Sequence, residues 1–387
     1  MKKFATGLVA LFLCFASNAG TGIDNSLLKE AKMSVSNATK FILSKQNKNG
    51  SWGPYGGMPA VTAICITSMA TSAEGQNEKV KTAIVKGEKS LLSYVRADGS
   101  IWEQNEKGYP NYSTSLAMVA LYVIDKKKHE LIIKRARRWI KKSQFGDDKG
   151  IEAGGIGYGS NKSKSDLSNT QLALEALFIT ADIEDENTSP EEVAATKKCW
   201  SKAQAFLSRC QALPKVNDQE WAKKAPGEDF GGSIYSPDRS KVDPKTGEVG
   251  VHRVYGSMTY AGLKSMIYAG IMSDDKLIKE DPRVKAAINW ASKNYTLDEN
   301  PGVGAQGHFY YIQTFTKALH AYGEDTIKGK DGKLHQWRKD VVKKLLSLQK
   351  ADGHWVNPEG RWMENVPVMV TAFSLSSMNY ALSKNLK

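Results

Sequence analysis

Two kinds of helical pattern alternate along the chain. In the first, as in "RARRWIKKSQ" at residues 135–144, apolar residues occupy one face and Lys or Arg the other. This pattern is typical of a helix that is half exposed to solvent. In the second, as in "STSLAMVAL" at residues 113–121, apolar residues lie nearly all round, which is typical of a buried helix. The alternation therefore predicts pairs made of one amphipathic helix and one buried helix.

The pair is repeated six times. In each copy the amphipathic helix runs into a turn of Gly and an aromatic residue, and the buried helix that follows carries a Thr near its start. The turn aromatics are Trp52, Trp102, Tyr158, Tyr235, Phe309 and Trp355, and the Thr residues are Thr62, Thr114, Thr170, Thr259, Thr314 and Thr371. Repeats of this length indicate stacked supersecondary units. The sequence predicts an all-α fold over residues 20–387, a single α/α toroid or (α/α)6 barrel of about 12 helices.

Two turns are near twins, "QNKNGSW" at residues 46–52 and "QKADGHW" at residues 349–355. Each contributes Gln, Gly and Trp at the same offsets: Gln46, Gly50, Trp52, Gln349, Gly353 and Trp355. We expect the Gln amide to bond free backbone groups at a neighbouring helix end, the Gly to permit a tight turn, and the Trp to fill the space between repeats. If the ring closes, the sixth repeat lies beside the first.

The spacing of these residues resembles the QW motif of the prenyltransferase and squalene oxidase repeat, with the best matches at 37–52 and 135–144. That repeat occurs in triterpene cyclases and in the β subunits of protein prenyltransferases. The segments "GHFYYIQTFTKALHAYGEDTI" and "DGHWVNPEGRWMENVPVMVTAFSL" are also similar to exported bacterial proteins of the squalene-hopene-cyclase-like group. The resemblance implies a central cavity that takes a hydrophobic, polyprenoid-type ligand.

The chemistry of that family is not predicted. A class II terpene cyclase needs Asp-x-Asp-Asp at the start of an inner helix, where neighbouring carboxylates shift one another's pKa values. The six expected inner-helix starts contain only Asp166 and Glu364 as acidic residues, each without an acidic neighbour. The Asp, Cys and His zinc site of the prenyltransferases has no counterpart at suitable spacing either. No metal ion or cofactor is predicted there.

The remaining candidates lie at the rim of the ring. His308 is a candidate acid or base with Glu364 as its partner or as a second acid, and Tyr311 and Asp166 complete the candidate catalytic set. Candidate ligand-binding residues are Tyr112, Tyr255, Tyr310, Gln313 and Trp362. The alternative is that these side chains fill a wide inner ring and cap helix starts. The long loop of residues 211–259 offers Asp229, Asp238 and His252 as a further metal or glycan site, although a surface loop is the alternative there too.

The first residues bear on the compartment. Two lysines precede an apolar run of 13 residues and "SNA" at 17–19, which is typical of a secretory signal peptide of residues 1–19, cut after Ala19. The mature protein is then secreted or periplasmic, and no transmembrane anchor is predicted because no second apolar run approaches 20 residues. It keeps Cys65, Cys199 and Cys210, an odd number that we expect to be buried thiols. The formal net charge is +13, but the lysines are scattered and nucleic-acid binding is not predicted.

Two classes of function stay open. The first is a cyclase-like enzyme acting on a hydrophobic small molecule in the cavity. The second is a non-catalytic scaffold that binds a protein, lipid or glycan, with a glycan-active α/α-barrel enzyme as a further alternative. The lining of the cavity separates them. An apolar, aromatic-walled pocket favours the isoprenoid, and a shallow groove with two facing carboxylates favours glycan cleavage.

Overall fold

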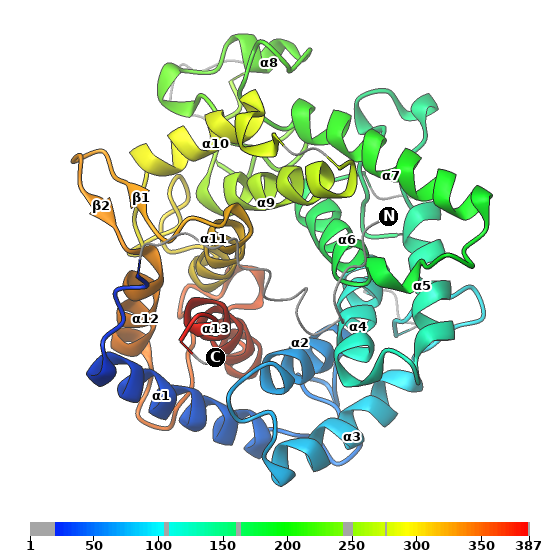
Figure 1. Cartoon of the computed structure of the whole chain (residues 1–387), viewed down its shortest axis with the longest axis vertical. Helices are drawn as coiled ribbons and strands as arrows, with labels where there is room; N and C mark the ends of the chain where they lie inside the picture. Colours follow the sequence, from blue (N-terminus) through cyan, green and yellow to red (C-terminus); the bar gives the residue numbers. More distant parts are fainter. Residues whose placement is uncertain (1–19, 104–107, 160–163, 243–250, 275–276, 386–387) are drawn as a thin grey trace.

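The computed structural model describes residues 20–103, 108–159, 164–242, 251–274 and 277–385, and these form two concentric rings of helices (Figure 1). Each inner helix contacts the next, and the last contacts the first, so the ring is closed. The inner helices are α2 (Pro59–Ala70), α4 (Pro110–Asp125), α6 (Leu167–Ile179), α9 (Gly256–Met272), α11 (His308–Tyr322) and α13 (Pro367–Leu382). The predicted all-α toroid is confirmed.

The outer ring has one helix for each inner helix. Its members are α1 (Asn25–Ser44), α3 (Glu78–Leu92), α5 (Glu130–Lys142), α7 (Pro190–Arg209), α10 (Pro282–Lys293) and α12 (Trp337–Leu348). The inner helices are buried along most of their length, whereas each outer helix buries one face, as the two patterns predict. Pro at the first helical position begins α2, α4 and α13, since Pro has no N–H to satisfy there.

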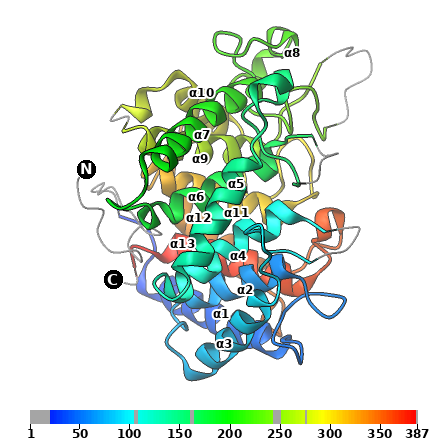
Figure 2. The same cartoon turned by 90° about the vertical axis from the view of Figure 1, so that its right-hand side faces the viewer.

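Small elements decorate the rings. A short helix, α8 (Glu220–Lys223), lies in the long loop before α9 and projects beyond the outer ring, while a hairpin of β1 (Ile327–Lys328) and β2 (Leu334–His335) precedes α12 (Figure 1). Short 3₁₀ turns are η2 (Asp147–Glu152), η3 (Ala181–Ile183), η4 (Gly227–Asp229), η5 (Ile278–Glu280) and η6 (Arg361–Met363). Viewed from the side, the connections that enter the inner helices gather on one face of the toroid (Figure 2).

The repeated Gln joins neighbouring repeats. The Gln46 amide donates to the Gly50 carbonyl at 2.9 Å and to the Ala83 carbonyl, in the middle of α3, at 2.8 Å. Gln349 bonds Gly353 in the same way and reaches the Ser34 carbonyl of α1 at 3.1 Å. Gln144 and Gln211 make the equivalent bonds to the carbonyls of Cys199 and Arg283. The acceptors on the next repeat therefore lie within helices, rather than being the free helix-end groups that we expected.

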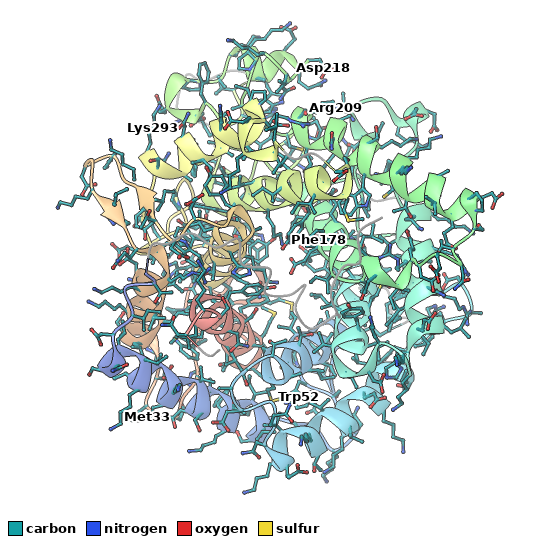
Figure 3. All side chains as sticks on the ribbon, viewed as in Figure 1. Met33, Trp52, Phe178, Arg209, Asp218 and Lys293 are labelled. Atoms are coloured by element: carbon teal, nitrogen blue, oxygen red, sulfur yellow. The ribbon has the colours of Figure 1, made fainter. Side chains whose placement is uncertain are left out.

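The Gly of each twin turn meets the outer helix of the next repeat, and the Trp bonds the outer helix of its own repeat. Gly50 has φ +84°, and a Cβ there would lie 2.3 Å from the Lys86 carbonyl oxygen. Gly353 has φ +93° and approaches the Asn37 carbonyl in a similar way, so a side chain would push α12 and α1 apart. Trp52 is fully buried between the two rings, and its indole N–H donates to the Ile42 carbonyl at 2.7 Å (Figure 3).

The repeated Thr fixes each turn to its inner helix. The hydroxyl of Thr62 accepts the Trp52 N–H at 2.9 Å. Thr114, Thr170, Thr259 and Thr371 do the same for the backbone N–H of Ile101, Ile156, Ser233 and Trp355. Repeat five departs from this rule because Thr314 bonds only within its own helix, to Tyr311. Phe309, which we expected in the turn, lies in the first turn of α11.

The remaining expectations concern the cysteines, the signal peptide and membrane-spanning helices. The three cysteines expected in the mature protein are free and buried, as predicted. The signal-peptide prediction falls on residues 1–19, which lie outside the described residues. Within the described part of the chain, no helix combines the length and the apolar character needed to cross a membrane.

Candidate functional site

Six tyrosines gather where inner helices α4, α6, α9 and α11 begin. We call this group the tyrosine mouth, and its members are Tyr109, Tyr112, Tyr158, Tyr235, Tyr255 and Tyr310. The rings of Tyr112 and Tyr158 stack with centroids 5.7 Å apart and planes 12° apart, and Tyr109 packs against Tyr158 at 5.6 Å. The hydroxyls of Tyr158 and Tyr235 lie 3.4 Å apart. Helix starts and turns from separate repeats thus build one aromatic surface.

The turn aromatics of repeats three and four reach the mouth because they come two residues later in the turn than those of repeats one and six. In repeats one and six the residue bonded to the Thr hydroxyl is itself the aromatic, Trp52 or Trp355. In repeats three and four that residue is Ile156 or Ser233, and the tyrosine comes two positions later. Trp52 therefore packs between the rings, whereas Tyr158 and Tyr235 lie beside the start of α6. Tyr109 remains 40% exposed.

Asp166 is the carboxylate at the centre of the mouth. It precedes α6 as its N-cap and accepts the Asn169 N–H at 2.8 Å and the Ser168 hydroxyl at 2.7 Å. Ser168 in turn accepts the hydroxyl of Tyr112 at 2.9 Å. Burial raises the pKa of Asp166, although its hydrogen bonds act in the opposite direction. The side chain is 1% exposed, so its direct contacts are those of a helix cap.

Three cations border the tyrosines. Lys241 Nζ lies 4.2 Å from the centre of the Tyr235 ring, and the Arg239 guanidinium lies 5.3 Å from the same centre. The Arg361 guanidinium lies over Trp362 at 4.7 Å and bonds the Gln306 side chain. Burial, and then the charge of Arg239, lowers the pKa of Lys241, and Arg361 acts in the same direction. Among the described residues, none of the three cations has a carboxylate partner within ion-pair distance. Sequence reasoning missed Arg239 and Lys241.

Four predicted binding residues join this surface or the channel below it. Tyr112, Tyr255 and Tyr310 belong to the mouth, and the hydroxyl of Tyr310 accepts the Gln171 amide at 3.2 Å. Gln313 lies one helical turn further along α11 and lines the central channel. Trp362, the fifth predicted binding residue, is 38% exposed in a left-handed conformation with φ +57°.

Three predicted catalytic residues make structural contacts instead. The His308 imidazole lies 2.8 Å from the Leu297 carbonyl, and the charges that act on it are those of Lys344, Asp298 and Glu299. The Tyr311 hydroxyl donates to the Thr296 carbonyl at 2.7 Å. Glu364 accepts the Tyr310 N–H at 2.7 Å and the Asn357 amide at 2.7 Å, which makes it a cap for the start of α11. The structure does not bring the His308 and Glu364 side chains together as an acid–base pair.

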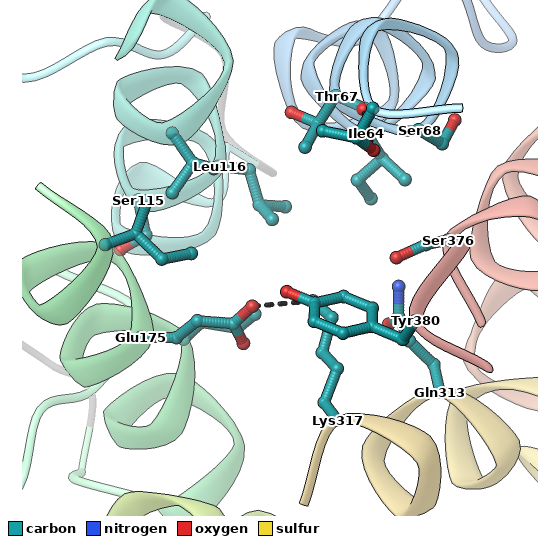
Figure 4. Close-up of a pocket in the computed structure, with 14 residues that line it drawn as sticks. Ile64, Thr67, Ser68, Ser115, Leu116, Glu175, Gln313, Lys317, Ser376 and Tyr380 are labelled. Carbon is teal, nitrogen blue, oxygen red and sulfur yellow. Dashed lines mark hydrogen bonds and ion pairs between the residues drawn. The ribbon is translucent and has the colours of Figure 1, made fainter. Parts of the chain in front are cut away.

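The central channel of the ring contains a small cavity that lies further along α6 and α11 than the mouth. Side chains from α2, α4, α6, α11 and α13 enclose a cavity in which the space open to the centre of a water molecule is about 40 Å³ (Figure 4). Its charged residues are Glu175 and Lys317, and Lys264 of α9 contacts Glu175 from the side. Sequence reasoning missed all three. The available sign was a single charged residue five positions after Thr170 and after Thr259, in helices that otherwise carry no charge.

The candidate site in the long loop is not assembled. Asp229 pairs with Arg253 at 2.7 Å, and Asp238 pairs with Lys164 at 2.8 Å. His252 packs edge-on against Trp221 with centroids 6.1 Å apart. In the described residues, no group of three or more His, Cys, Asp or Glu side chains is arranged to hold a metal ion.

The fold is shared with known enzymes of two classes. The type II terpene cyclase MstE from Scytonema, in complex with geranylgeranyl dihydroxybenzoate, matches at TM-score 0.54 and 14% identity over 92% of this chain and 99% of that one. The family 76 glycoside hydrolase (mannosidase) of Bacteroides thetaiotaomicron matches at TM-score 0.59 and 11% identity over 92% of this chain and 100% of that one. An inactive variant of the α-1,6-mannanase of Salegentibacter sp. HEL1_6, in complex with α-1,6-mannotriose, matches at 0.57 and 12%, over 91% and 99%.

Comparison by sequence adds no relative. No protein-family model matches the chain, and no curated protein matches it. Membership of the QW-type repeat family stays a prediction. At 11–14% identity the structural likeness shows one thing, that the chain has the α/α-toroid fold of these terpene cyclases and mannanases.

Proposed function

We propose that this protein binds an acidic glycan at the tyrosine mouth. The observation that carries the proposal is the set Arg239, Lys241 and Arg361, three cations at an aromatic surface with no carboxylate partner among the described residues. Arg239 and Arg361 are exposed and Lys241 is half-buried, so all three charges can be reached by a ligand from solution. A ligand that carries carboxylate or sulfate groups supplies a counter-charge and makes charge-assisted hydrogen bonds.

The tyrosines suit the sugar part of such a ligand. Tyr109 is 40% exposed in the mouth and Trp362 is 38% exposed beside Arg361, and the C–H face of a sugar can pack against either ring. Burial raises the pKa values of Tyr112, Tyr158 and Tyr235, so their hydroxyls stay neutral at pH 7 and can accept hydrogen bonds, the Tyr112 O–H being already donated to Ser168. An apolar surface with a few placed polar groups is the usual composition of a ligand site.

The alternative of a polyprenoid in the central cavity has less support. A space of about 40 Å³ for water centres holds only a few water molecules, and a polyprenoid chain is many times larger. The cavity also contains an ion pair, and an apolar chain placed there would have to desolvate it. Binding at the mouth needs no such desolvation.

The proposal is of binding, not of cleavage. Glycosidases of the usual kind need two carboxyl groups on either side of the scissile bond. Among the described residues, Asp166 is the carboxylate that influences the mouth tyrosines, with Glu175 acting in addition on Tyr310. Asp166 is occupied as a helix cap. The mouth therefore offers recognition groups without a facing pair of acids.

Titration calorimetry with three probes tests this assignment. We expect an oligogalacturonate to bind, a neutral mannohexaose to bind at least tenfold more weakly, and geranylgeranyl diphosphate to compete only at low salt, through its charge. Lys241→Gln should weaken oligogalacturonate binding about fivefold, or about 1 kcal/mol, and added salt should weaken the wild type. Lys293→Gln on the outer ring is the matched control (Figure 3).

Two outcomes would overturn the proposal. Equal binding of the neutral and acidic sugars would remove the role of the cations. Competition by the diphosphate that survives about 0.5 M salt, at which exposed charges are strongly screened, would return the polyprenoid as the better ligand. Tyr158→Ala, compared with Tyr55→Ala on a loop where that ring is 99% exposed, separates loss of ring packing from loss of charge.

A further inference from the structure

The channel cavity carries charge that its own residues do not balance. Lys317 Nζ of α11 lies 2.6 Å from Glu175 Oε1 of α6, and Lys264 Nζ of α9 contacts Glu175 Oε2 and lies 2.5 Å from Gln171 Oε1. The side chains of Lys264, Glu175 and Lys317 are 1%, 7% and 12% exposed. Two ammonium groups thus share one carboxylate. Within the described chain, neither lysine has a second carboxylate within ion-pair distance.

The ionisation states support a net charge of +1. Burial alone would raise the pKa of Glu175, but the two lysines outweigh it and lower that pKa to about 2. Burial lowers the pKa of Lys264 to about 8, against the attraction of Glu175. At pH 7 the Glu175 carboxylate is ionised and Lys264 is mainly protonated. A buried, uncompensated charge of this kind is costly unless an opposite charge or water meets it.

The cavity beside the lysines is small and lined by both polar and apolar groups. In Figure 4, Glu175 and Lys317 face one another at its edge, and the Ser376 hydroxyl of α13 points into it. The Gln313 amide and the Tyr380 ring close the same side, with Lys317 Nζ 5.8 Å from the centre of that ring. The apolar lining comes from Ile64, Leu116, Val119, Leu172 and Ile179, and the hydroxyls of Thr67, Ser68, Thr71 and Ser115 add further polar groups. A space of about 40 Å³ for water centres admits an ion of atomic or near-atomic size.

We propose that the channel cavity is a binding site for a small monovalent anion, held by Lys317 with help from Gln313 and Ser376. The ligand class is a halide or a carboxylate of one or two carbons. Such an ion completes a group of two cations and two anions that is neutral overall. The site is separate from the tyrosine mouth, and neither assignment depends on the other.

Thermal unfolding at constant ionic strength tests the site. We compare sodium chloride, sodium acetate and sodium hexanoate with sodium gluconate, an anion too large for the cavity. An anion that binds only the folded protein raises Tm by mass action, and we expect chloride and acetate to raise it by about 2 °C at saturating concentration. Lys317→Gln should abolish that rise. Lys285→Gln, which removes an exposed lysine paired with Glu280, should preserve it.

A direct measurement covers the case in which Lys317→Gln does not fold. Crystals of the unaltered protein grown with sodium bromide should show an anomalous-scattering peak within hydrogen-bond distance of Lys317 Nζ. Absence of that peak, together with equal Tm in chloride and gluconate, would refute the site. A larger rise with hexanoate than with acetate would refute the assignment to a small free anion. If Lys285→Gln also lost the rise of Tm in chloride, the rise would be due to surface screening, and the proposal would be overturned.

Discussion

Gly353→Ala tests whether the glycines of the twin turns are essential for closing the ring. Gly353 has φ +93°, a conformation that costs an L-residue about 1 kcal/mol or more. An added Cβ would also lie 2.6 Å from the Asn37 carbonyl oxygen and 2.7 Å from its carbon. Those are backbone atoms of α1, so relief requires helix α1 to move away by roughly half an ångström. Overpacking of this kind costs about 2 kcal/mol, and the expected total is about 3 kcal/mol.

Gly332→Ala is the matched control, because it shares the backbone conformation without the contact. Gly332 has φ +79° in the β1–β2 hairpin, and nothing lies within 4 Å of the position that an alanine methyl group would take there. We expect it to cost about 1 kcal/mol. For a chain of this length each kcal/mol lowers Tm by about 1 °C, so differential scanning calorimetry should give a decrease near ~1 °C for Gly332→Ala and near ~3 °C for Gly353→Ala. Equal decreases would refute the argument that close approach, and not the turn alone, fixes this glycine.

Two further predictions concern the inner helices. Thr62→Val should lower the free energy of unfolding, measured with denaturant, by about 1–3 kcal/mol, since it leaves the buried Trp52 N–H without its acceptor. Thr314→Val should lower it by about 1 kcal/mol, because the Thr314 hydroxyl bonds Tyr311 of its own helix. Equal decreases would contradict the joining role of Thr62. Glu175 has its pKa lowered to about 2 in the folded protein, so its contribution to stability is present above its ordinary pKa of about 4.5 and is lost as the pH falls from there towards 2. Glu175→Gln should flatten the dependence of unfolding free energy on pH over that range. At pH 7 it should destabilise the protein by about 3–5 kcal/mol, because it leaves two buried lysines unpaired. An unchanged pH dependence between pH 4.5 and 2 would contradict the assigned ion pairs.

The sequence predicts the architecture well because the same local physics is repeated six times. An apolar face or an apolar circumference, a Gly at the turn and a Thr at the next helix start recur at similar offsets, and the Gln46 and Thr62 hydrogen bonds show why those residue types are needed. Errors arise where a repeat departs from the rule. Phe309 falls in a helix and not in a turn, because repeat five does not use its Thr to hold the turn.

The candidate site is predicted less completely, for a physical reason. Tyr112, Tyr255 and Tyr310 could be placed at the rim because helix starts share one face of the toroid. The directions of individual side chains could not be placed, because they depend on which loop lies opposite. Glu364 and His308 are close in the predicted rim, yet the carboxylate caps α11 and the imidazole meets Leu297. Lys241 lies in a long loop whose path no repeat specifies, so its contact with Tyr235 has no sequence signature.

Position within the repeat separates structural residues from candidate functional ones. Thr62 and its counterparts occupy one repeat position and make the same bond in five of the six inner helices. Five residues further on, two neighbouring inner helices place Glu175 and Lys264, of opposite charge, where the other inner helices carry apolar or small uncharged residues. A joint needs the same residue in every copy, because every copy has the same backbone to satisfy. A buried charge that only some copies carry has no such architectural reason, and its burial is costly. The cavity beside Lys317 therefore merits a direct search for a bound anion.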